Sequence, residues 1–81
     1  MQAINTSYHT PSKISTRERE VLELLSYGYS SPEIASSLYL SPHTVNDHRK
    51  ALMSKLSVKN VAQMVRRGFE LNLLNLTNHS S

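Results

Sequence analysis

The stretch that decides the fold is SPHTVNDHRKALMSKL, from Ser41 to Leu56. Ser41 can accept hydrogen bonds from the free amides of a first helical turn, and Pro42 suits that turn because it has no amide of its own. Since neither glycine nor proline follows, the stretch predicts a helix over residues 42–56. At about 100° per residue, its large apolar side chains fall on one narrow arc and most polar ones on the opposite arc. One face is therefore suited to a core and the other to water or a partner.

The polar arc of this predicted helix carries an unusual mixture of groups. The apolar arc consists of Val45, Leu52 and Leu56, with Met53 at its edge. The opposite arc consists of His43, Asn46, Asp47, Lys50 and Ser54, flanked by His48 and Arg49. A solvated face more often carries Glu/Lys pairs four residues apart, whereas the edges of DNA bases require amide, carboxylate and ammonium groups. On periodicity alone an ordinary surface helix fits equally well, so the neighbouring segments have to decide.

The segment before this helix predicts a helix-turn-helix unit. Ser30-Ser31-Pro32-Glu33 forms a capping box with proline in the first turn. Ile34, Ala35 and Leu38 then give the apolar stripe of a short helix. Tyr39-Leu40 forms the turn, so about three or four residues join the two helices, which is helix-turn-helix spacing.

An earlier helix is predicted to begin at Ser15, where Ser15-Thr16-Arg17-Glu18 forms another capping box. Its apolar stripe consists of Val21, Leu22, Leu24 and Leu25. Gly28 stands at the C-terminal cap position, and Tyr29 is predicted to pack beneath the turn. The charged run Arg17-Glu18-Arg19-Glu20 is predicted to be a solvated face that supports the cap.

The last predicted helix spans residues 61–73 and follows an Asn60 cap. Its apolar residues cover an arc of roughly 200°, whereas about 100° suffices for docking on one core. The surplus part of the arc is predicted to be a dimer interface and consists of Met64, Gly68 and Leu71. No segment shows a strand pattern, so the fold class is all-α.

Length and composition limit the remaining possibilities. The chain has 81 residues and a net charge of +3, and six of its nine Lys/Arg residues lie in the second half. We expect one domain over residues 14–74, a flexible arm or linker over 1–13 and a flexible tail over 75–81. The basic half favours a polyanionic partner. No cysteine is present and no apolar run could span a membrane, so we expect a cytoplasmic protein without metal or cofactor.

The run from Ile14 to Asn60 resembles the LuxR-type helix-turn-helix domain, which also ends NarL/FixJ-type response regulators. The matching positions are Arg17-Glu18-Arg19-Glu20-Val21-Leu22, Gly28, Glu33-Ile34-Ala35, Ser41, Thr44-Val45, His48, Lys55-Leu56 and Val58. The resemblance implies a four-helix domain without a wing that binds double-stranded DNA as a homodimer and regulates transcription. It further implies that the helix over 42–56 enters the major groove and that the helix over 61–73 dimerises, weakly when DNA is absent.

Site residues follow from the same resemblance and from the polar arc. Asn46, Asp47 and Lys50 match base-reading positions. The residues predicted to contact phosphates or to position the helix are Ser41, His43, Thr44, His48, Arg49, Ser54 and Lys55. Asn46 stands where many members carry Lys or Arg, and Asp47 stands where many carry a neutral residue, which makes the reading face less basic.

Other functions remain open or are excluded. The chain offers no cysteine nucleophile and no glycine-rich phosphate loop, so we expect no enzyme. A promoter-recognising module like region 4 of a sigma factor has a similar helix arrangement; it would bind RNA polymerase and not self-associate. For a LuxR-type domain, RNA polymerase also remains a possible partner that the sequence does not decide. An interaction module that has lost DNA binding is the third reading, and the acid at Asp47 supports it.

Overall fold

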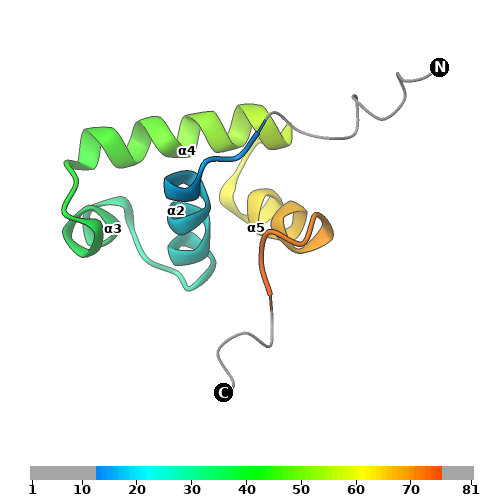
Figure 1. The fold of residues 1–81 in the computed structure, drawn as a ribbon, viewed down its shortest axis with the longest axis horizontal. Coiled ribbons are helices and arrows are strands. Elements are labelled where there is room, and N and C mark those ends of the chain that lie inside the picture. Colours follow the sequence, from blue (N-terminus) through cyan, green and yellow to red (C-terminus); the bar gives the residue numbers. More distant parts are fainter. Residues whose placement is uncertain (1–12, 76–81) are drawn as a thin grey trace.

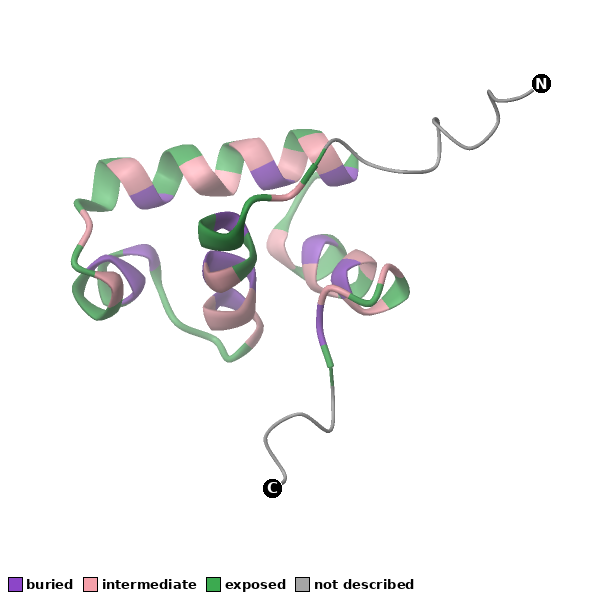
Figure 2. Cartoon of the chain, viewed as in Figure 1, coloured by how far each residue is buried: buried purple, intermediate pink, exposed green. Residues whose placement is uncertain are grey.

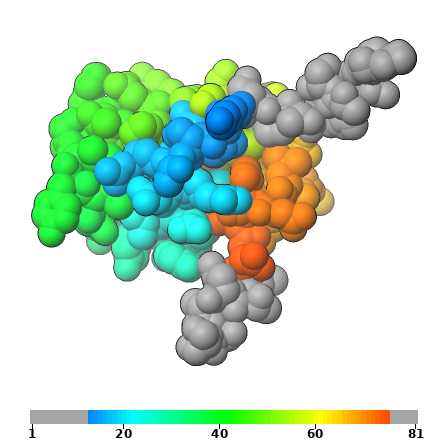
Figure 3. Space-filling model, in the orientation of Figure 1, coloured from blue at the N-terminus to red at the C-terminus, as the bar shows by residue number. Residues whose placement is uncertain are grey.

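The computed structural model describes residues 13–75, which form α2 (Thr16–Ser26), α3 (Ser31–Leu38), α4 (Pro42–Leu56) and α5 (Val61–Glu70). α4 packs against the other three helices, and α2 also packs against α3 and α5 (Figure 1). The side chains of α2 fill the space beside α4 in the space-filling view (Figure 3). The predicted all-α helix-turn-helix fold is therefore confirmed. Most of the predicted arm and tail, residues 1–12 and 76–81, lies outside the described residues.

Each described helix begins at the predicted cap. Ser15 and Ser30 both form complete capping boxes, with Glu18 and Glu33 as their reciprocal partners. Ser41 and Asn60 each accept a hydrogen bond from the backbone amide three residues later. These bonds satisfy amides that the first helical turn leaves without a partner, which is why such short helices start where they do.

The turns between the helices use left-handed backbone conformations. Gly28 follows α2 with a φ of +94°, which confirms its predicted role at the end of that helix. Tyr39 lies between α3 and α4 with a φ of 59°, and the following amide of Leu40 donates to the carbonyl oxygen of Ala35. Tyr29 is exposed, so the prediction that it packs beneath the turn was wrong.

The core confirms the predicted orientation of α4. Val45, Leu52 and Leu56 are buried, and the buried part of α4 faces the other helices (Figure 2). Their neighbours in the core come from the other helices and include Val21, Leu22, Leu25, Ile34 and Met64. Full burial of each such side chain contributes about 1.5–3 kcal/mol, so the apolar arc holds α4 in one rotation about its axis.

The apolar arc of α5 is used in the opposite way to the prediction. Met64 is 0% exposed and Gly68 is buried, while Leu71 is half-buried and packs on the core. Met64 and Gly68, two of the three residues assigned to a dimer interface, therefore belong to the interior of one chain. The prediction was wrong for these two because helical periodicity gives the width of an apolar arc but not which part of it meets the core, whereas an interface role for Leu71 stays a prediction.

The chain that follows α5 explains why Met64 and Gly68 face the core. The helix ends at Glu70, three residues before the predicted 73, and Asn72 turns the chain with a φ of 61°. Leu74 then folds back into the core beside Gly68, where a Cβ would lie 2.8 Å from the Leu74 Cδ1 atom. Elsewhere on the apolar arc of α5, Ala62 is exposed, while Val65 and Phe69 are half-buried and pack partly against the core.

Candidate nucleic-acid interface

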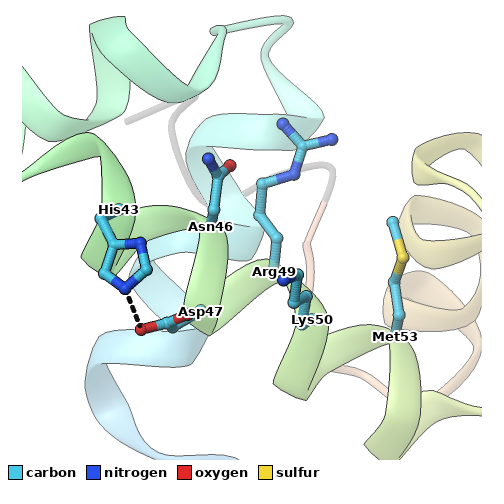
Figure 4. A pocket seen from close by; sticks show the side chains of 6 residues that line it. All are labelled: His43, Asn46, Asp47, Arg49, Lys50 and Met53. Atoms are coloured by element: carbon cyan, nitrogen blue, oxygen red, sulfur yellow. Dashed lines mark ion pairs between the residues drawn. The ribbon is translucent and has the colours of Figure 1, made fainter.

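The outward face of α4 presents the predicted polar side chains to solvent. An open depression on this face is lined by His43, Asn46, Asp47, Arg49, Lys50 and Met53 (Figure 4). The three predicted base-reading residues, Asn46, Asp47 and Lys50, are all exposed. The buried apolar arc on the opposite side of α4 therefore brings these three side chains to one surface.

The residues predicted to contact phosphates or to position the helix differ in how exposed they are. Ser41, His43 and Ser54 are exposed, whereas Thr44, His48, Arg49 and Lys55 are half-buried. At the start of α4, the Ser41 hydroxyl donates to Thr44 Oγ1 over 3.0 Å and accepts from the Thr44 amide. A helix N-terminus favours negative charge, so this exposed end of α4 suits a phosphate group.

His43 and Asp47 form an exposed pair one turn apart. The His43 Nε2 atom lies 3.6 Å from Asp47 Oδ2, and the side chains are 87% and 59% exposed. The pair attracts only when the imidazole is protonated, and solvent screens it strongly. Among residues 13–75 no three His, Cys, Asp or Glu side chains gather in a way that could hold a metal ion.

A short chain of hydrogen bonds links α3 to α4. The Ser31 hydroxyl donates to Asn46 Oδ1 over 2.9 Å, and Arg49 Nη1 donates to the Ser31 Oγ atom over 2.7 Å. Figure 4 shows Asn46 and Arg49 pointing to the same side of α4, away from the His43–Asp47 pair. Ser31 was not identified from the sequence, where it reads only as the first residue of a capped helix.

Lys55 is held by a partner within the chain. Its Nζ atom lies 2.7 Å from Glu18 Oε1 and 2.9 Å from the carbonyl oxygen of Lys13. Glu18 is only 7% exposed, so the prediction that its charged run is a solvated face was wrong for this residue. The ion pair joins the start of α2 to the end of α4.

The same contact sets the protonation of Glu18. Burial alone would raise the pKa of this carboxyl, but the hydrogen bonds from Lys55 and the Ser15 amide, with the Lys55 charge, outweigh it and lower the pKa. A lowered pKa means that folding favours the carboxylate. This contribution to stability is complete above the ordinary Glu value of about 4.3 and is lost as the pH falls through the lowered value.

The sequence matches a family model described as "Bacterial regulatory proteins, luxR family" over residues 12–67. It is 43% identical over 68 residues to the transcriptional regulatory protein UhpA of Escherichia coli (strain K12), covering 84% of this chain and 35% of UhpA. The chain therefore spans about a third of that relative. None of the helices over residues 13–75 is long and apolar enough to cross a membrane.

Solved structures with a similar fold include the following two. One, titled "Structure of Transcription factor, GerE", aligns with a TM-score of 0.73 and 34% identity, covering 76% of this chain and 92% of that chain. The other, the response regulator ChrA of a heme-sensing two-component system, aligns with a TM-score of 0.75 and 30% identity, covering 85% of this chain and 35% of that chain.

The Glu18–Lys55 pair leads to a prediction about acid stability. Lys55→Met removes the ammonium and leaves a buried carboxylate without its cation, so the free energy of unfolding should fall by about 1–3 kcal/mol near pH 7. The deficit should shrink at a pH well below the ordinary Glu value, because the carboxyl is protonated as the pH falls through its lowered pKa and the pair then contributes less. Urea unfolding of both proteins at the two pH values measures the deficit.

Arg17→Met is the matched control for Lys55→Met, because Arg17 pairs with Glu20 at 3.1 Å while both side chains are 44% exposed. Its effect should stay below about 0.5 kcal/mol. A Lys55→Met deficit that is equal at both pH values would show that the ion pair is not its cause.

Proposed function

The chain belongs to the luxR family of bacterial regulatory proteins and is a DNA-binding domain of a transcription regulator, and from this premise we propose that α4 enters the major groove. The observation that carries the proposal is the fixed orientation of α4. Its apolar arc is buried, and its opposite face presents amide, carboxylate and ammonium groups to solvent. A major groove admits one α-helix and offers donors and acceptors that such groups can distinguish.

Each exposed group on this face has a distinct use. Lys50 can donate to guanine O6 and N7, and Asp47 can accept a hydrogen bond from the cytosine amino group. Asp47 also repels phosphates, so it lowers the affinity for wrong sequences more than it raises the affinity for the right one. Asn46 supplies an amide at the edge of this face that lies next to α3.

Contacts to phosphates position α4 over the bases. The exposed start of α4 carries the positive end of the helix dipole, and His43, His48 and Ser54 lie on or beside the outward face. We assign Lys55 and Arg49 to holding α4 in place, because each is bonded to another helix of the same chain. Phosphate neutralisation releases counterions, which makes such binding steeply dependent on salt.

A partly exposed apolar strip on α5 supports a dimer. Ala62 is exposed and Val65 and Phe69 are half-buried, so they form an apolar strip beside the exposed Arg66. A two-fold contact brings this strip against its own copy. One short helix buries less area than a stable interface of about 1,200–2,000 Å² requires, so the dimer should be weak until DNA holds two copies together.

This function implies the partners of the domain and its compartment. Double-stranded DNA is the principal partner, and the domain works in the cytoplasm, where RNA polymerase is a further partner. A protein-interaction module that no longer binds DNA is the second candidate. The exposed carboxylate of Asp47 in the middle of the reading face favours it, because a phosphate-rich partner would be repelled there.

Replacement of Lys50 tests the reading face. Lys50→Ala should weaken binding to the preferred duplex by about 1–3 kcal/mol and relax the preference at one base pair. Lys59→Ala removes the same charge from the exposed turn after α4 and should leave the base-preference profile unchanged. Competition over all single-base variants of a selected site, at several salt concentrations, measures both effects.

Two results would argue against major-groove reading by α4. An unchanged base-preference profile in Lys50→Ala would remove Lys50 from the reading face. A titration of the wild-type domain with duplex DNA that stays flat even at low salt would favour the interaction module.

Replacement of Ala62 tests the dimer. Ala62→Glu places a carboxylate in the apolar strip and should lower cooperative binding to paired half-sites by about tenfold, or about 1.4 kcal/mol. Gln63→Glu is the matched control, because it adds the same charge one position along α5 and can still accept from the Lys59 amide. Cooperativity that is equal in both variants would exclude this strip as the interface.

A further inference from the structure

We propose that Ser31 is a positioning residue that fixes the Asn46 amide as a hydrogen-bond donor toward DNA, so that the base facing Asn46 is guanine or thymine and not adenine. The inference rests on the proposed function of α4 and adds a base class to it. It is drawn from the chain of hydrogen bonds that runs from Arg49 through Ser31 to Asn46.

The direction of this chain follows from the chemistry of its members. A guanidinium has only donors, so the Ser31 oxygen must accept the bond from Arg49 Nη1 over 2.7 Å. The hydroxyl retains one hydrogen to donate. Asn46 has a single accepting atom, Oδ1, and this atom lies 2.9 Å from Ser31 Oγ. Each donor thus meets an acceptor only when Oδ1 faces α3.

Burial makes the opposite orientation of the amide costly. Ser31 is 8% exposed, so its hydroxyl cannot exchange freely with water. With the amide rotated, Asn46 Nδ2 would donate to an oxygen that already accepts from Arg49, and the serine hydrogen would lose its acceptor. A buried donor without a partner is unfavourable by about 1–3 kcal/mol, which corresponds to a population ratio of about fivefold or more.

The exposed part of the Asn46 side chain is therefore its NH₂ group. Guanine presents two acceptors in the major groove, O6 and N7, and thymine presents the acceptor O4. Adenine presents one acceptor and one donor, and its usual bidentate pairing with asparagine needs Oδ1 as well as Nδ2. Because Oδ1 is engaged by Ser31, the adenine amino group would meet a donor instead of an acceptor.

The test begins with selection of preferred sites from random duplexes by the wild-type domain. Asn46→Ala then identifies the base pair that Asn46 reads, as the one whose preference disappears. We expect guanine or thymine there, preferred over adenine by about tenfold. Adenine at that position, or an unchanged profile in Asn46→Ala, would overturn the inference while leaving sequence-selective DNA binding intact.

A second arm tests the role of Ser31 itself. Ser31→Ala frees the amide to rotate, so adenine should become accepted at that one base pair while the base pair read by Lys50 keeps its preference. Ser37→Ala, an exposed serine on the same helix, should leave the whole profile unchanged. A Ser31→Ala protein that binds more weakly without a change of profile would show a purely structural role and overturn the inference.

The arms separate this inference from the proposed function. If Ser31→Ala does not fold, as judged by urea unfolding, the identity of the base facing Asn46 in the wild-type selection decides alone. If the wild-type domain selects no sequence, the proposal that α4 reads DNA bases and the proposed role of Ser31 are both wrong.

Discussion

Burial of Val45, Leu52 and Leu56 is the constraint on which the rest of the structure depends. These side chains lie on one narrow arc of α4, and the core that receives them is supplied by the other three helices. A helix held along one arc has no freedom to roll, so its opposite arc is fixed in direction as well. The face that we assign to DNA is thus set by apolar packing on the side of α4 that never meets DNA.

Polar contacts hold α4 at two further points. The Glu18–Lys55 pair ties its C-terminal end to α2, and the Ser31 hydroxyl ties its middle to α3 through Asn46 and Arg49. Both contacts engage cations of α4 within the chain. If α4 reads DNA as we propose, this arrangement favours discrimination between sequences over strong general attraction to DNA.

Local features of the fold could be predicted from the sequence, and long-range choices could not. Caps at Ser15, Ser30 and Ser41 depend on residues three positions apart, so they were readable directly. The Glu18–Lys55 pair joins residues 37 positions apart, and nothing local marks it. Met64 and Gly68 of α5 were assigned to an interface although they face the core, because the return of Leu74 to Gly68 exists only in three dimensions. Asn46, Asp47 and Lys50 share a surface as predicted, whereas their roles toward DNA stay predictions.

The most direct test of the account is a nuclear magnetic resonance titration of the isotopically labelled domain with its selected duplex. If α4 reads the major groove, the largest shift changes should fall on the start of α4 and on its outward residues, including the side-chain amide of Asn46. The amides of α5 should change little with a single half-site. Shift changes concentrated on α5 or on the turn between α2 and α3, with the outward residues of α4 unaffected, would contradict the assignment of α4 as the reading helix.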